Sequence, residues 1–162
     1  MILTKQFEEA KTHLIKLKSF TEFMIDDYTN MGYFQILSAQ HKEAEANFYR
    51  ALKMNPNHPI VLNNLGYALI LLENYGEAKQ YLEKAIKLSP LFAEPYNNLG
   101  QLKLLTNQLE EGKVLIEKSI ALNPENAHAY KNLGDYYLKA ENMELAKFNF
   151  DKASELDSDI II

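Results

Sequence analysis

Four glycines in this 162-residue chain are separated by a constant interval of 34 residues. They are Gly32, Gly66, Gly100 and Gly134, and a large apolar residue (methionine or leucine) precedes each of them. Pro56, Pro90 and Pro124 repeat at the same interval. A fixed period that runs through most of a chain predicts stacked supersecondary units rather than one closed core.

Each 34-residue unit has the pattern of two helices. In the second unit, Leu62, Leu65 and Leu69 lie three and four residues apart, which places them on one face of a helix. A second helix is predicted from Tyr75, with Ala78 and Leu82 on its apolar face. The small residues Gly66 and Ala78 would let the two antiparallel helices approach closely.

The run Leu62-x-x-Leu65-Gly66-x-x-Leu69, followed by Ala78-x-x-x-Leu82-x-x-Ala85 and Pro90, resembles the tetratricopeptide repeat. The other units match less fully and depart from the pattern at Gln35, Lys103, Gly112, Ser119 and Ser158. The resemblance implies an all-α fold, a right-handed α-solenoid of stacked helix–turn–helix repeats. We expect one domain over 1–162, with an N-terminal helix at 1–20 and repeats at 25–58, 59–92, 93–126 and 127–160.

The two ends of the chain carry separate predictions. Residues 1–20 match the second helix of a repeat, and Ser19-x-x-Glu22 has capping-box spacing, which predicts a new helix from about Phe20. The alternative is one long amphipathic helix that continues into the first repeat. At the other end, Ser154 gives the last helix a polar position, whereas Phe148 and the tail Ile160-Ile161-Ile162 leave apolar side chains available for a second chain.

The predicted binding residues come from the first helix of each repeat, because in tetratricopeptide proteins these helices line a concave groove that usually binds peptides. Asparagine stands two residues before all four repeat glycines, at Asn30, Asn64, Asn98 and Asn132. An amide donates and accepts hydrogen bonds, so a row of them can hold a peptide backbone, as in the asparagine ladder of some family members. The neighbouring predicted contacts are Tyr33, Tyr67, Asn63, Asn97 and Gln101. The alternative is that asparagine is merely common at this repeat position.

The resemblance implies a non-catalytic protein–protein interaction scaffold or adaptor. Its partner is expected to be a neutral to mildly basic protein or peptide, since Asp26, Glu94 and Asp135 lie at groove-facing positions. Chaperone-binding relatives hold a C-terminal carboxylate with lysine, arginine and asparagine. Only one of the matching positions here agrees with that clamp, and Glu94 has the wrong charge, so that ligand is not expected. The alternative function is a self-associating structural module, a homodimer formed through the terminal apolar surfaces.

Other function classes are disfavoured by composition. The chain has no cysteine, and its four histidines lack metal-ligand spacing, so we expect no metal, no cofactor and no enzyme activity. The net charge of −5 argues against a nucleic-acid partner. No signal peptide or apolar stretch of membrane-spanning length is apparent, which predicts an intracellular, cytoplasmic protein.

Overall fold

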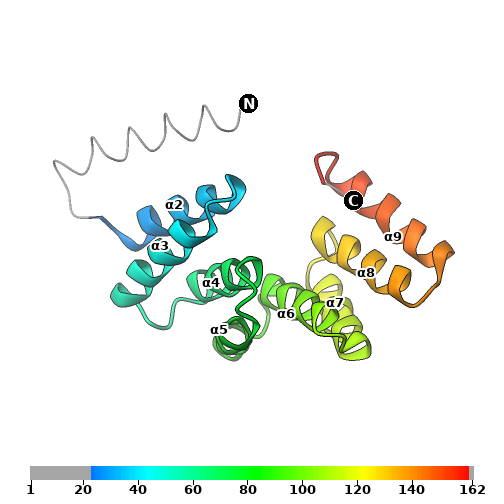
Figure 1. Cartoon of the computed structure of the whole chain (residues 1–162), viewed down its shortest axis with the longest axis horizontal. Coiled ribbons are helices and arrows are strands. Elements are labelled where there is room, and N and C mark those ends of the chain that lie inside the picture. Colours follow the sequence, from blue (N-terminus) through cyan, green and yellow to red (C-terminus); the bar gives the residue numbers. More distant parts are fainter. Residues whose placement is uncertain (1–22, 161–162) are drawn as a thin grey trace. The chain divides into compact units, whose positions relative to one another are not determined.

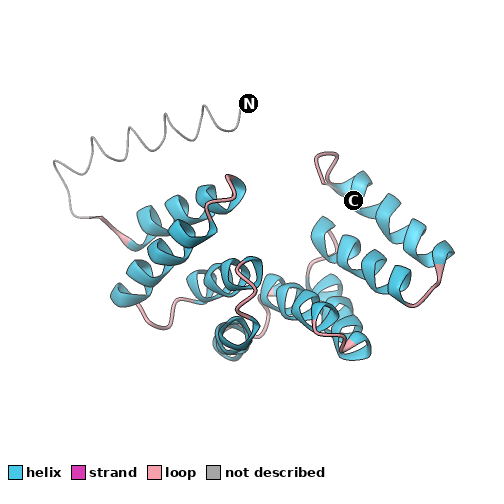
Figure 2. Cartoon of the chain, viewed as in Figure 1, coloured by secondary structure: helices cyan, strands magenta, loops and turns pink. Residues whose placement is uncertain are grey.

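The computed structural model describes residues 23–160, and within that range the chain forms eight α-helices and no strand (Figures 1 and 2). The helices are α2 (Ile25–Leu37), α3 (His41–Met54), α4 (Pro59–Leu71), α5 (Tyr75–Leu88), α6 (Ala93–Leu105), α7 (Leu109–Leu122), α8 (Ala127–Lys139) and α9 (Met143–Leu156). The predicted all-α helical repeat is therefore confirmed.

The turn inside each helix pair repeats one backbone geometry. Its middle residue has a left-handed conformation, with φ between 57° and 60°, and none of the four is glycine: Ala39, Glu73, Asn107 and Glu141. In each turn the next residue donates its N–H to a carbonyl five positions earlier, as from Gln40 to Gln35 at 2.8 Å. This bond satisfies a carbonyl at the end of the first helix and reverses the chain into the second.

The left-handed turns give a stability prediction. Because a side chain at positive φ is strained and glycine is not, Ala39→Gly is expected to raise the free energy of unfolding by about 0.5–1 kcal/mol. Ala46→Gly is the matched control, since Ala46 is exposed inside α3 and glycine there should cost about 1 kcal/mol. Urea denaturation measures both changes, and a loss of stability in both variants would contradict the prediction.

The chain divides into two compact units, residues 1–81 and 82–162, with the boundary inside α5. In the first unit α3 packs against both α2 and α4. Phe48 of α3 and Leu62 and Leu65 of α4 have no exposed surface and form its core. The ring of Phe48 lies over Gly32 of α2, where an added Cβ would come 2.5 Å from Cε1 of the ring. The repeat glycine is thus needed for close approach of the two helices.

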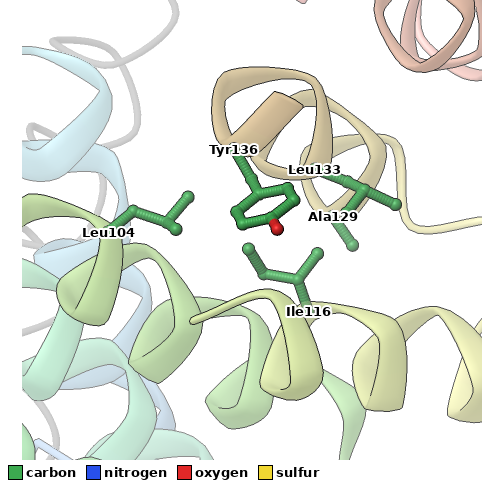
Figure 3. Packing of buried hydrophobic residues seen from close by; sticks show 5 residues of the cluster. All are labelled: Leu104, Ile116, Ala129, Leu133 and Tyr136. Carbon is green, nitrogen blue, oxygen red and sulfur yellow. The ribbon is translucent and has the colours of Figure 1, made fainter. Parts of the chain in front are cut away.

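In the second unit, α7 packs against α6 and α8, and α9 against α8. Figure 3 shows one cluster of this core, in which Tyr136 of α8 lies above Ile116 of α7. The other members of the cluster are Leu104, Ala129 and Leu133. The phenol O–H of Tyr136 donates to Oε1 of Glu110 at 2.6 Å, and this bond, together with burial, raises its pKa to about 12. The tyrosine therefore joins α8 to the start of α7 through an apolar and a polar contact.

Two positions that depart from the repeat pattern are polar and have specific partners. Gln35 of α2 is buried and accepts a hydrogen bond from Nδ2 of Asn47 in α3 at 2.7 Å. Lys103 of α6 extends to the carboxylate of Glu111 in α7, 2.7 Å from its Oε2. Each substitution thus replaces an apolar contact between paired helices with a hydrogen bond or an ion pair.

The first described helix differs from the sequence expectation. It begins at Ile25, not near Phe20, because Phe23 and Met24 are not helical. The N–H of Met24 donates to Oδ2 of Asp27 at 2.8 Å, which caps the helix at this point. The alternative of one helix that continues into the first repeat is wrong for the same reason.

Several predictions about the ends remain open. The N-terminal helix at 1–20, the residues Ser19 and Glu22 predicted to cap the next helix, and the tail residues Ile161 and Ile162 lie outside the described residues. Ser154 is exposed, as a terminal polar position would be, and Phe148 is 63% exposed. The four repeat boundaries and the single domain stay predictions.

Candidate functional site

The exposed side chains of α2 form a single line along the helix. They are Asp26, Asn30, Tyr33 and Leu37, at steps of four, three and four residues. This spacing keeps them on one face of an α-helix, while the other faces turn toward neighbouring helices. We call this line, and the equivalent line on each first helix, the stripe.

The stripes of the other first helices occupy the same repeat positions. They are Ile60, Asn64, Tyr67 and Leu71 on α4, Glu94, Asn98, Gln101 and Leu105 on α6, and His128, Asn132, Asp135 and Lys139 on α8. In the first unit α2 contacts α4, and in the second unit α6 contacts α8. Each unit therefore presents two neighbouring stripes, with an asparagine near the middle of each.

In the first unit, the two predicted tyrosines lie close together. Tyr33 is 52% exposed and Tyr67 is half-buried. Burial raises the pKa of Tyr67 above its ordinary value of 10, and the nearby Tyr33 hydroxyl raises it further. The two tyrosines thus stand on helices that contact each other, and the same two helices carry Asn30, which is exposed, and Asn64, which is half-buried.

The asparagine that precedes Asn64 has a different position. Asn63 is only 6% exposed, and its Nδ2 donates to Oδ1 of Asn64 at 3.2 Å. The bond occupies one acceptor site of the Asn64 amide and orients it. The Asn64 side chain is half-buried, and its amide retains further donor and acceptor capacity.

In the second unit, several polar side chains at or beside the stripes bind to one another. Nδ2 of Asn132 donates to Oδ1 of Asn97 at 2.9 Å, and the two side chains are 4% and 5% exposed. Beside them, Nζ of Lys131 lies 2.9 Å from Oδ2 of Asp135. Asn132 and Asp135 are therefore engaged within the chain. Asn98 and Gln101 are half-buried.

The structure thus separates the predicted residues into two groups. The buried group consists of Asn63, Asn97 and Asn132. The residues of the other group are exposed or half-buried: Asn30, Tyr33, Asn64, Tyr67, Asn98 and Gln101. The stripe also includes Leu37 and Ile60, 56% and 49% exposed, which were not among the predicted site residues. The four-, three- and four-residue spacing of the stripe was the sequence signal that could have found them.

The chemistry of the stripes is that of amides, aromatic rings and a few charges. Within residues 23–160, no three histidine, aspartate or glutamate side chains are grouped so that they could hold a metal ion. None of the helices in the described part of the chain combines the length and the apolar character needed to cross a membrane. The stripes offer a ligand amide, aromatic, aliphatic and carboxylate side chains.

Solved structures with the same fold include three informative ones. A fragment of MamA from Desulfovibrio magneticus RS-1 is 26% identical, with a TM-score of 0.65, covering 83% of this chain and 76% of that one. YrrB, described as a tetratricopeptide repeat protein with an unusual peptide-binding site, is 25% identical (TM-score 0.61; 97% and 79% covered). The tetratricopeptide repeat protein TTC0263 from Thermus thermophilus is 20% identical (TM-score 0.77; 83% and 75% covered).

No protein of curated function matches the chain. The family model for the tetratricopeptide repeat, in contrast, matches residues 28–58, 60–90, 93–126 and 127–160. These four segments hold the helix pairs α2–α3, α4–α5, α6–α7 and α8–α9. The chain belongs to the tetratricopeptide repeat family, whose members are generally non-catalytic scaffolds for protein interactions.

Proposed function

We propose that this protein is a non-catalytic adaptor whose units each bind an extended segment of a partner protein on their first-helix stripes. The observation that carries the proposal is the asparagine at one repeat position on α2, α4 and α6, accessible or partly accessible on each. Each amide presents a donor and an acceptor, as a peptide group does, so each of these positions can hold a ligand backbone whatever its side chains. YrrB, a 25% identical protein of the same fold, is described as having a peptide-binding site, which supports the same use here.

The charges of the stripes favour a neutral to mildly basic partner. Asp26 and Glu94 are exposed at the start of their helices, whereas Asp135 is paired with Lys131. No lysine or arginine lies on the stripes of α2, α4 or α6. An acidic tail or a C-terminal carboxylate would therefore meet no cation on these stripes.

The asparagine row is tested by replacing Asn64 and Asn98 together with alanine. Each lost hydrogen bond costs about 0.5–1.5 kcal/mol, so the double substitution should weaken partner binding by roughly fivefold or more. The partner is obtained by affinity capture from the native cell with the unmodified chain as bait, and its affinity for each variant is then measured by calorimetry.

The control for that experiment is Asn57→Ala, since Asn57 is exposed in the turn between α3 and α4, off the stripes. It should leave both affinity and helical circular dichroism unchanged. Equal affinities of the double variant and the control would show that the asparagines do not hold the ligand.

A second candidate function, self-association, has one observation in its favour. Phe148 of α9 and Val114 of α7 occupy the same repeat position, 34 residues apart, and each is 63% exposed. Light scattering after size exclusion distinguishes the two functions, because a homodimer through this face requires a doubled mass that Phe148→Asp abolishes. A monomeric mass at high protein concentration would contradict self-association and leave the adaptor function as the remaining candidate.

A further inference from the structure

The two units offer a ligand different chemistry. The stripes of the first unit combine two tyrosines with Leu37 and Ile60, which are both about half exposed, and contain one charged residue, Asp26. In the second unit the equivalent tyrosine positions hold Gln101 and Asp135, and Asp135 is already paired with Lys131. The second unit also has an exposed acid, Glu94, and an exposed leucine, Leu105, so the two tyrosines are what distinguish the first unit.

We infer that the first unit is a selective subsite for an extended segment that carries an apolar side chain and a basic side chain on opposite sides of its backbone. This inference rests on the proposed function, since it places the ligand backbone over Asn30 and Asn64. It goes further by assigning the flanking side-chain contacts to Tyr33 with Tyr67 and to Asp26.

The geometry of the α2 stripe supports the two contacts. Asp26 lies four residues before Asn30, and Tyr33 three residues after it. At a rise of 1.5 Å per residue, the Cα atoms of Asp26 and Tyr33 lie about 6 Å and about 4.5 Å along the helix axis from that of Asn30. Both distances are within reach of side chains from a backbone that crosses the helix at Asn30.

The ligand side chains must alternate because the backbone is extended. Successive side chains of an extended chain point in opposite directions, so one set meets the tyrosines and the other meets Asp26. The apolar and basic residues are therefore separated by an odd number of positions, one or three. Neighbouring packed helices are about 8–10 Å apart, which an extended chain covers in about three residues at roughly 3.3 Å each.

The charge contact has a clear sign. Asp26 is exposed, and the adjacent Asp27 accepts the N–H of Met24, so negative charge is concentrated at the start of α2. The stripes of α2 and α4 contain no cation. A lysine or arginine of the ligand is attracted there and a carboxylate is repelled, and added salt weakens this part of the binding.

The inference is tested by panning a phage-displayed library of random dodecapeptides on the full chain. Peptides selected should pair an apolar residue with lysine or arginine one or three positions away. In synthetic copies, serine in place of the apolar residue should lower affinity at least tenfold for the unmodified chain but less than threefold for Tyr33→Ala. Asp26→Lys should reverse the charge preference, so that peptides selected on this variant carry glutamate at the position of the basic residue.

Matched control variants lie on second helices. Glu43→Lys reverses an exposed charge on α3, and Phe148→Ala truncates an exposed aromatic on α9. Both should leave the peptide affinities unchanged. Selected peptides without the apolar–basic pair, recovery of no peptide, or the same selectivity in Tyr33→Ala would overturn the inference.

The same variants separate this inference from the proposed function. If Asn64→Ala lowers the affinity of the selected peptides but Tyr33→Ala and Asp26→Lys do not change it, the selective subsite is overturned. The same result supports the role of the asparagines in holding the ligand. The proposed function is overturned separately, by the affinity of the captured partner. It fails if the Asn64 and Asn98 double variant binds that partner as tightly as Asn57→Ala does.

Discussion

Replacing Phe48 by alanine is expected to lower the free energy of unfolding by about 3–5 kcal/mol, a large part of the stability of a small domain. Phe48 has no exposed surface, and its ring covers Gly32, which has no side chain to move into the space. It also lies on α3, the helix that contacts both α2 and α4. The cavity would therefore weaken two helix interfaces in the first unit at once.

Phe148→Ala is the matched control, because Phe148 is 63% exposed on α9. The same truncation there should change the free energy of unfolding by no more than about 0.5 kcal/mol. Urea unfolding followed by circular dichroism measures both variants, at a concentration at which light scattering shows a monomer. Similar losses in the two variants would mean that the first unit is not organised around Phe48.

Much of the fold follows from the sequence because the repeat positions encode pair packing directly. Ala44, Ala78 and Ala146 are buried on the second helices, and the repeat glycines lie beneath large side chains such as Phe48 and Phe150. These contacts are short-range within each pair, so a periodic pattern is enough to predict them. The family assignment rests on the same positions.

The start of α2 and the pairing of polar groups did not follow from the pattern. Ser19-x-x-Glu22 satisfied a capping rule, but Asp27 caps the helix at Met24. The buried contact of Gln35 with Asn47 depends on two residues twelve positions apart, neither of which belongs to the repeat pattern. Such contacts are set by the geometry of packed helices rather than by propensity along the chain.

The candidate site shows the same division. Repeat spacing placed four asparagines at one position, but whether each remains accessible depends on its neighbours in space. Asn132 is buried because the residue that precedes the asparagine of α6, Asn97, accepts its amide N–H. Asn30, at the same repeat position on α2, is exposed. One repeated residue type therefore supplies a structural hydrogen bond in one unit and an accessible amide in the other.

Replacing Gly100 by alanine should destabilise the second unit by about 1–3 kcal/mol, although alanine is the better helix former. An added Cβ would lie 2.6 Å from Cγ1 of Ile116 and 2.9 Å from the backbone oxygen of Gly112. Ile116 is fully buried, and the Gly112 oxygen belongs to α7, which packs along α6. The strain can be relieved only by moving one helix away from the other.

Gly76→Ala isolates that steric effect from helix propensity. Gly76 lies in the first turn of α5, and an added Cβ there would meet no atom within 4 Å. This variant should gain about 0.5 kcal/mol, because alanine loses less backbone entropy than glycine when the helix forms. Opposite signs in urea denaturation identify close helix contact as the role of the repeat glycine. A gain of stability in both variants would show that α6 and α7 have room for a methyl group, and that the repeat glycine is not required for their packing.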